Sequence, residues 1–306
     1  MPTLALKVDV DTLRGTREGV PTLLRLLARH RLRATFLFSL GPDHTGRALK
    51  RVFRPGFLAK VRRTSVTSHY GLKTLLYGTL LPGPDIGRLA AEPMRATYRA
   101  GHEVGVHTWD HILWQDNVAR KDAAWTRRQM RLAVDRFAEI FGHAPKVHGA
   151  AGWQMNDAAY LLEEELGFAL ASDGRGDAPY RPVVHGRALA VPQLPTTLPT
   201  LDELIGVDGI TPENVAAHLL KLSLDGRDHV YTLHAELEGG QLAPVFDALL
   251  SGWSQSGLRV GSMTDYAATL DLGALPRKGV GMGTVPGRSG VLAVPVNLPP
   301  GPAGLA

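Results

Sequence analysis

The stretch KVDVDT, Lys7 to Thr12, decides how the rest of the chain is interpreted. Val8 and Val10 are β-branched and predict a buried strand within the longer run LALKVDVD. Asp9 and Asp11 are two residues apart, so in a strand they share one face. Buried carboxylates side by side repel each other unless a cation lies between them, and a metal ion would supply that cation. The alternative is that both acids lie in solvent past the strand end or cap the following helix.

The composition is that of an ordinary globular chain: 306 residues, 44% hydrophobic and 21% charged. There is no cysteine, which excludes disulfides, thiolate metal sites and a cysteine nucleophile. We expect no transmembrane helix and no signal peptide, because no apolar run reaches about 18 residues and no basic region precedes one at the N-terminus. The formal net charge of +5 is compatible with nucleic acid, anionic lipid or a phosphorylated ligand.

Short β-rich runs alternate with helical patterns up to about residue 270. The further strand-like runs are RATFLFSLG (33–41), EVGVHTW (103–109), KVHGAAGW (146–153), ALASDGRG (169–176), HVYTLHAE (229–236) and LRVGSMTDY (258–266). Helical spacing is clear in TREGVPTLLRLLARHR (16–31) and WTRRQMRLAVDRFAEIFG (125–142). Repeated βα units of this kind predict an α/β fold whose parallel sheet closes, or nearly closes, into a barrel.

Two segments break this alternation. Residues 42–88 form an insertion, and GRALKRVFRPGFLAKVRR (46–63) within it is basic, contains no acid and has interleaved apolar residues. Such a stretch suits an anionic membrane surface, although a solvated basic helix packed on the barrel is the alternative. We expect no nucleic-acid partner, because no nucleic-acid-binding signature accompanies the charge. The Gly- and Pro-rich residues 273–306 predict a loosely structured tail after a domain of residues 1–272.

Two histidines follow the strand-like run EVGV. His107 and His111 are spaced i, i+4, so both can bind one metal ion if the chain turns helical there. With Asp11 they would form a three-ligand set with open positions, which is the usual form of a hydrolytic metal site. The pair alone is a weak signal, because the chain contains 12 histidines.

Polar residues also end two later strand-like runs. His234 ends HVYTLH and could enter the same cavity, although a lone histidine there is more often structural. Asp173 and Arg175 follow ALAS, where a carboxylate could orient a histidine and an arginine could orient a carboxylate. The alternative for these two is an ordinary Gly-rich turn.

Together these pieces resemble the polysaccharide deacetylase family, also called the NodB homology or carbohydrate esterase 4 group. VDVDT, HTWDH, GAAGW, SDGRG and TLHAE stand in the order of its five motifs, between about residues 4 and 270. The resemblance implies a distorted (β/α) barrel of the NodB type and a divalent metal, zinc first, with cobalt, manganese or nickel as alternatives. It implies that Asp11, His107 and His111 bind the metal. It further implies that Asp9 is the general base, that His234 is the general acid, and that Asp173 orients His234.

One branch of that family is similar in more detail. The similar stretches are VDVDTLRGTREGVP, FSLGPDHTGR, HEVGVHTWDH, AAGWQ, SDGRG and YTLHAELEG. The branch consists of deformylases of lipid A modification, a part of lipopolysaccharide biosynthesis linked to polymyxin resistance, which act on 4-deoxy-4-formamido-L-arabinose carried on undecaprenyl phosphate. The resemblance implies a metal-dependent amide hydrolase, peripheral on the cytoplasmic face of the bacterial inner membrane, with the lipid-linked sugar and an anionic membrane surface as partners. The alternatives are a deacetylase of another N-acetylated sugar, such as peptidoglycan or chitooligosaccharide, and a non-catalytic sugar- or phosphate-binding barrel.

The chain departs from the wider family at its third motif. The family carries an arginine there that orients the base, whereas this chain has HGAAGWQ with no arginine. We therefore expect Arg175, in SDGRG, to take that place.

Overall fold

The computed structural model describes residues 1–48 and 73–299, and its strands and helices alternate as the sequence pattern predicts. The strands are β1 (Thr3–Val10), β2 (Thr35–Ser39), β3 (Glu103–Thr108), β4 (Val147–His148), β5 (Leu170–Ala171), β6 (Arg181–Val184), β7 (Arg187–Ala188), β8 (His229–His234), β9 (Arg259–Gly261), β10 (Arg277–Gly283) and β11 (Leu292–Val296). The α-helices are α1 (Val20–His30), α4 (Ile86–Leu89), α5 (Ala91–Arg99), α6 (His111–Asn117), α7 (Ala123–Phe141), α8 (Asp157–Glu165), α9 (Leu201–Leu204), α10 (Val215–Ser223), α11 (Ala243–Gln255) and α12 (Met263–Ala267). Shorter helical turns are η1 (Gly15–Gly19), η3 (Thr74–Leu76), η4 (Val118–Arg120) and η5 (Ala151–Trp153).

The main sheet is parallel and curled, which confirms the predicted fold class. Its strand order is β5-β4-β3-β2-β1-β8, and β9 pairs with the first residues of β1. An extended segment, residues 193–198, joins the two outer strands of this order. Leu194 N donates to Ala171 O at 2.7 Å beside β5, and Thr197 N donates to Val230 O at 3.1 Å beside β8. The result is a distorted barrel in which β1 is central.

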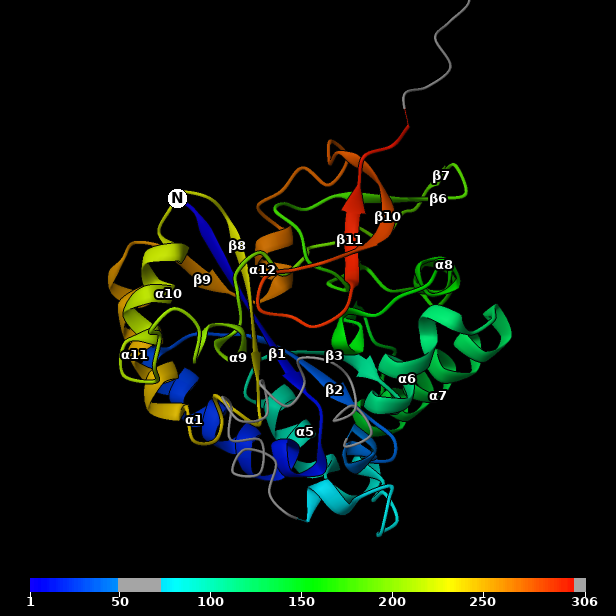
Figure 1. The fold of residues 1–306 in the computed structure, drawn as a ribbon, viewed down its shortest axis with the longest axis horizontal. Helices are drawn as coiled ribbons and strands as arrows, with labels where there is room; N and C mark the ends of the chain where they lie inside the picture. The colour runs from blue at the N-terminus through cyan, green and yellow to red at the C-terminus, as the bar shows by residue number, and fades with distance from the viewer. Residues whose placement is uncertain (49–72, 300–306) are drawn as a thin grey trace, which may run out of the picture.

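Helices cover the outside of this barrel (Figure 1). Contacts link them in the order α10, α11, α1, α5, α7 and α8 around the sheet. The longest, α7, begins where the Asp122 carboxylate accepts a hydrogen bond from Trp125 N, and it ends at Gly142 in the left-handed conformation (φ 79°). Both ends therefore follow from capping residues that are visible in the sequence.

The alternation of side chains along β1 divides the buried residues between two cores. Leu4, Leu6, Val8 and Val10 belong to the large core shared with the helices. Ala5 points the other way, into a smaller apolar cluster inside the barrel that also contains Leu37, Val147, Leu170, Leu194, Val230, Met263, Tyr266 and Ala267. Lys7 and Asp9 share the parity of Ala5, so they follow it along the interior face of the strand. All of β1 is buried, and polar residues on its inner face can only meet the barrel interior.

The C-terminal segment corrects the expectation of a loosely structured tail. Its strands β10 and β11 pair with each other and, through β6, form a four-stranded sheet with β7. A Cβ atom on Gly279 or Gly281 would approach the Val296 side chain to 2.9 or 2.7 Å. The glycines of β10 therefore serve close packing across the strand pair, whereas composition alone indicated disorder. Residues 300–306 lie outside the described residues.

The described part of the insertion consists of residues 42–48 and 73–88. It contains an ordered turn in which Gly78 N donates to Leu81 O at 2.7 Å, and Leu80 in this turn is 81% exposed. Most of the basic stretch expected at the membrane, from residue 49 onward, lies outside the described residues. Within residues 1–48 and 73–299, no helix combines the length and the apolar character that a bilayer crossing requires.

Candidate metal centre and active site

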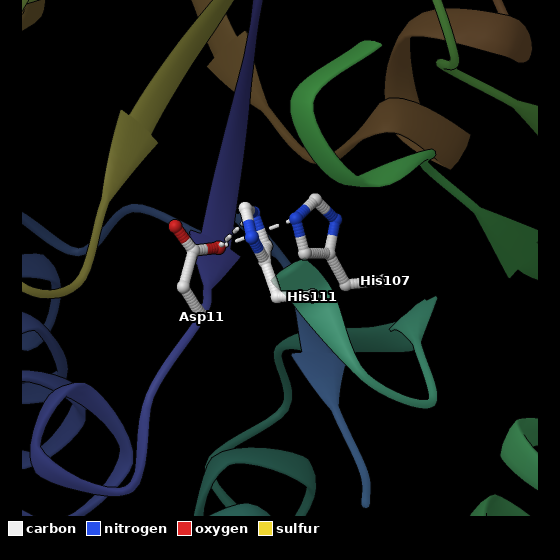
Figure 2. Close-up of side chains that lie close together, drawn as sticks. All are labelled: Asp11, His107 and His111. Carbon is white, nitrogen blue, oxygen red and sulfur yellow. Dashed lines mark ion pairs between the residues drawn. The ribbon is translucent and has the colours of Figure 1, made fainter. Parts of the chain in front are cut away.

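The three predicted metal ligands come together at the carboxyl end of the sheet (Figure 2). Asp11 Oδ1 lies 3.2 Å from His107 Nε2 and 3.5 Å from His111 Nε2. This oxygen is buried and accepts no hydrogen bond from the described residues. Two imidazole nitrogens that converge on one orphaned carboxylate oxygen form a donor set that suits a divalent metal ion.

Local structure places each histidine. His107 lies in β3, and the register between β2 and β3 shifts just before Ser39, which pairs with Thr108. Asp110 then caps helix α6 by accepting a hydrogen bond from Leu113 N, so that His111 becomes the first residue of that helix. The chain turns helical directly after the strand, as the i, i+4 spacing requires, and the two rings are 5.3 Å apart.

The orientation of the His107 ring is fixed from behind. Its Nδ1 donates to Gly149 O at 2.6 Å, which leaves Nε2 as the nitrogen with a free lone pair toward Asp11. A hydrogen bond of this kind on the far nitrogen is the usual support of a metal-binding histidine. The residues present therefore fit a metal ion.

The electrostatics of Asp11 agree with a ligand role. Burial opposes the ionisation of its carboxyl, but the positive charge that His111 and His107 carry when protonated outweighs that effect and holds the pKa of Asp11 well below its usual range. This favours the carboxylate form of Asp11, which is the form that binds a metal.

Glu236 contacts the backbone of a predicted metal ligand, and the sequence analysis did not single it out. Its Oε1 accepts hydrogen bonds from Asp11 N at 3.1 Å, from Thr12 N at 2.9 Å and from Thr12 Oγ1 at 2.7 Å. A Cβ atom on Gly15 would lie only 2.0 Å from that oxygen, so a side chain at this position would displace the Glu236 carboxyl group. Burial, and then the charge of Asp11, raise the pKa of Glu236 well above its ordinary value. Glu236 thus fixes the backbone of Asp11, and the available signal was its position two residues after His234.

The predicted base and acid lie on neighbouring strands. Asp9 of β1 is opposite His234 of β8 in the parallel register. Asp9 Oδ1 is buried and has no hydrogen-bond partner among the described residues, and the same holds for His234 Nδ1. The His234 ring meets the Trp153 ring edge-on, with centroids 6.4 Å apart. The register brings Asp9 and His234 to the same end of the sheet as the metal ligands.

The cation beside Asp9 is Lys7 and not Arg175. Lys7 Nζ lies 3.3 Å from Asp9 Oδ2 and donates to Ser172 O at 3.1 Å. Arg175 instead pairs with Glu203 at 2.6 Å and donates to Leu198 O at 3.1 Å. The expectation that Arg175 supports the base is therefore corrected, because a carboxylate from α9 holds its guanidinium elsewhere.

Asp173 contacts a different histidine from the one expected. Its Oδ1 lies 2.8 Å from His148 Nδ1, which is also 2.7 Å from Glu163 Oε1. The Gln193 amide donates to both carboxylates, at 2.6 Å to Asp173 and 3.1 Å to Glu163. Asp173 Oδ1 also accepts the Ala150 N–H at 2.8 Å. Asp173 therefore supports the loop whose Gly149 carbonyl holds His107, and no hydrogen bond or ion pair joins it to His234 among the described residues.

The cluster of His148, Glu163 and Asp173 is a second group with metal-ligand composition in the described chain. Burial lowers the pKa of His148, but the two acids outweigh that effect and raise it to about 10. Burial, and then the charge of Asp173, raise the pKa of Glu163 well above its ordinary value. The cluster therefore balances its charges as one imidazolium, one carboxylate and one protonated acid. The Gln193 side-chain amide and the Ala150 N–H donate hydrogen bonds to the carboxyl oxygens.

A cavity of about 360 Å³ opens beside the loops that follow β1 and β8. Its lining residues are Arg14, Gly15, Glu18, Gly19, Thr22, Ala235, Glu236, Gly239, Gly240 and Gln241. Glu236 belongs both to this lining and to the hydrogen bonds that hold Asp11. The cavity is large enough for a sugar-sized ligand.

Comparisons with known proteins agree with this geometry. The model of the polysaccharide deacetylase family matches residues 2–171. A probable 4-deoxy-4-formamido-L-arabinose-phosphoundecaprenol deformylase from Shewanella sediminis is 40% identical over 251 residues, which cover 81% of this chain and 80% of the relative. A protein of the same name from Wigglesworthia glossinidia brevipalpis is 29% identical over 281 residues, 91% of this chain and 97% of the relative. The fold is shared with a crystal structure from Mycobacterium smegmatis assigned to the polysaccharide deacetylases, with a TM-score of 0.62 and 20% identity over 90% of this chain and 93% of that one.

Proposed function

The chain belongs to the polysaccharide deacetylase family, and from that premise we propose that it hydrolyses the N-formyl group of 4-deoxy-4-formamido-L-arabinose carried on undecaprenyl phosphate. The products are formate and the free amino sugar on its lipid. The observation that carries the proposal is the 40% identity to a deformylase named for this reaction, over 81% of the chain. The convergence of Asp11, His107 and His111 supplies the matching site.

In the proposed reaction, Asp11, His107 and His111 would hold a divalent metal, which we propose to be zinc, and the metal would supply Lewis acidity toward the formyl group and the attacking water. Asp9 accepts the proton of that water at Oδ1, the oxygen with no other partner among the described residues. His234, across the register from Asp9, gives a proton to the leaving amine. Each of these proton transfers is expected to contribute about 10²–10⁴ in rate.

The sugar is proposed to occupy the cavity lined in part by Glu236, because Glu236 also accepts a hydrogen bond from the backbone of Asp11. A deacetylase of another N-acetylated sugar is the second candidate, since the family name itself describes that reaction. Formyl and acetyl groups differ by one methyl, which a pocket discriminates by only about 1–3 kcal/mol. The preference for formyl over acetyl is therefore measured by comparing turnover of two substrates that differ only in this acyl group.

The enzyme is proposed to work as a peripheral protein on the cytoplasmic face of the inner membrane, where an undecaprenyl-linked sugar is held. The basic composition of the sequence stretch 46–63 and the exposed Leu80 in the turn at residues 78–81 support an anionic membrane surface as partner. Sedimentation with anionic and neutral vesicles tests this. Neutralising Arg51, Arg54, Arg62 and Arg63, which lie outside the described residues, is expected to weaken binding to anionic vesicles, and unchanged binding would remove the idea.

The decisive experiment measures formate released from the formamido-arabinose lipid by the purified protein. Activity is expected to disappear with a chelator and to return with added zinc. The acetamido counterpart, assayed for acetate, separates the two candidate reactions. A protein that contains metal and releases neither acid would exclude both, whereas faster release of acetate would favour the second.

A further inference from the structure

We propose that Lys7 is the positioning residue of the catalytic base in this chain. Its ammonium group pairs with Oδ2 of Asp9 and fixes the orientation of that carboxylate beside the metal ligands. This inference rests on the proposed function, because it assigns a role within that reaction. It is drawn from the inner face of β1, where Lys7 and Asp9 occupy alternate positions and Asp11 follows one residue past the strand end.

The surroundings of Lys7 leave its charge few other partners. The side chain is fully buried, in the middle of a strand that is buried along its whole length. Its ammonium lies 3.3 Å from Asp9 Oδ2, donates to Ser172 O at 3.1 Å, and lies 5.5 Å from the centroid of the Trp153 ring. A buried cation is tolerated only when it is paired and hydrogen-bonded. The one carboxylate among these partners is that of Asp9, so the two charges depend on each other.

This contact distinguishes the two oxygens of Asp9. Oδ2 is directed toward Lys7, whereas Oδ1 has no hydrogen-bond partner among the described residues. His107 Nδ1 lies 3.8 Å from Oδ1, but it donates to Gly149 O at 2.6 Å. Oδ1 is therefore the oxygen available to a water proton. Because Asp9 is held by a fixed cation, it has no need of the metal as a counter-charge.

The site is shaped around the lysine stem. A Cβ atom on Gly149 would lie 3.0 Å from Lys7 Cε and 2.3 Å from Leu37 Cδ1. Gly149 therefore leaves space on the path of the Lys7 side chain, while its carbonyl oxygen holds His107. The same loop residue thus serves the cation of the base and the ring of a metal ligand.

The test compares turnover in two backgrounds. Lys7→Met keeps the length of the side chain and removes its charge. It is expected to lower kcat by about 10²-fold or more, with KM and bound zinc close to wild type. In the Asp9→Asn background the same substitution is expected to cause no further loss, because the base that Lys7 positions is already gone. Lys146→Met, at an exposed lysine that donates to Gly167 O, is the matched control and is expected to be neutral.

A second measurement needs neither metal nor substrate. Urea unfolding of the metal-free protein is compared for Lys7→Met, Asp9→Asn and the double variant. The double variant is expected to unfold at a higher urea concentration than Lys7→Met alone, because it leaves no buried carboxylate without its cation. Lys7→Arg, which keeps the charge, is expected to fold and to retain more turnover than Asp9→Asn.

The outcomes separate the two proposals. A wild-type protein that releases no formate refutes the proposed function, while the unfolding comparison still tests the pairing of Lys7 with Asp9. The role of Lys7 is refuted if Lys7→Met keeps full kcat, or if it lowers kcat equally in both backgrounds. Loss of zinc from Lys7→Met, or additive stability effects in the double variant, would also overturn it. If Lys7→Met does not fold, Lys7→Arg tests the role of Lys7 instead. A Lys7→Arg protein that folds and binds zinc, but turns over as slowly as Asp9→Asn, refutes that role.

Discussion

Replacing Asp173 with asparagine separates a structural role from a catalytic one. The motif resemblance implies that Asp173 orients His234, whereas the structure places it against His148, Gln193 and the Ala150 N–H. Asparagine has nearly the same shape but no charge, so it leaves the buried His148 imidazolium with Glu163 as its only carboxylate partner in the cluster. Breaking a buried ion pair by removing one partner costs about 3–5 kcal/mol. We expect a loss near the lower limit, about 3 kcal/mol, because Glu163 can ionise once the charge of Asp173 no longer opposes it.

The assay is urea unfolding of the metal-free protein, followed by kcat measured well below the unfolding transition. The folded fraction of Asp173→Asn is expected to keep kcat within about tenfold of wild type, since a loop shift reaches His107 only through Gly149. Asp177→Asn, at an exposed acid in the same loop, is the control. A variant as stable as wild type, with kcat lowered more than about 100-fold, would refute the structural role. It would support the role implied by the motif, in which Asp173 orients the general acid His234.

The same cluster predicts how stability depends on alkaline pH. The pKa of His148 is about 10 in the folded protein and ordinarily 6.5, so the folded state binds this proton more tightly. The stabilisation is fully present below pH 6.5 and is lost as the pH rises toward 10. In Asp173→Asn the loss of stability between pH 6.5 and 10 is expected to be smaller, because Asp173 is one of the two acids that raise the pKa of His148.

Three further changes probe the site and its support. Asp9→Asn is expected to keep the metal and to lower kcat about 10²–10⁴-fold, whereas His107→Ala is expected to lose both the metal and the activity. Metal analysis and formate release measure the two effects. A fully active Asp9→Asn protein would refute the assignment of Asp9 as the base. Glu236→Ala is expected to weaken zinc binding about 10–100-fold by calorimetry because it frees the backbone of Asp11, while Glu236→Gln retains an acceptor and much of the affinity. Burial, and then Arg33, lower the pKa of His102 from 6.5 to about 4, so the neutral ring contributes stability above pH 6.5 that is lost as the pH falls toward 4. The loss is at most about 3 kcal/mol, and His102→Asn should flatten that part of the stability–pH curve; an unchanged curve would contradict the burial argument.

The sequence predicted the barrel and the convergence of Asp11, His107 and His111 because both depend on local patterns. Strands β1, β3 and β8 are β-rich runs with a polar residue near the carboxyl end, and a parallel sheet brings such ends together. The placement of Asp11, His107 and His111 follows from strand order and from the capped start of α6, so spacing was sufficient. These parts of the site needed no knowledge of how distant loops pack.

The errors arose where the outcome depends on packing between distant segments. Lys7 was overlooked because a lysine in a strand ordinarily points to solvent, and only a β1 buried on both faces forces it inward. Its parity with Asp9 and Asp11 was the available signal. The partner of Asp173 was set by Glu163 on α8 and by Gln193, neither of which lies near SDGRG in sequence. The tail was misjudged because glycine content cannot distinguish a mobile segment from strands that pack closely.

The arrangement of β1 and of the residue after its end explains how two acids can be buried close together. Lys7 and Asp9 are alternate residues of the strand, about 6.6–6.8 Å apart, and Asp11 lies just past the strand end, so the charges follow in the order positive, negative, negative. The first pair neutralises itself, and the imidazoles of β3 and α6 provide the donors that complete a cation site at the last acid. Because the proposed base and its cation belong to the same strand, their relative position depends on β1 itself.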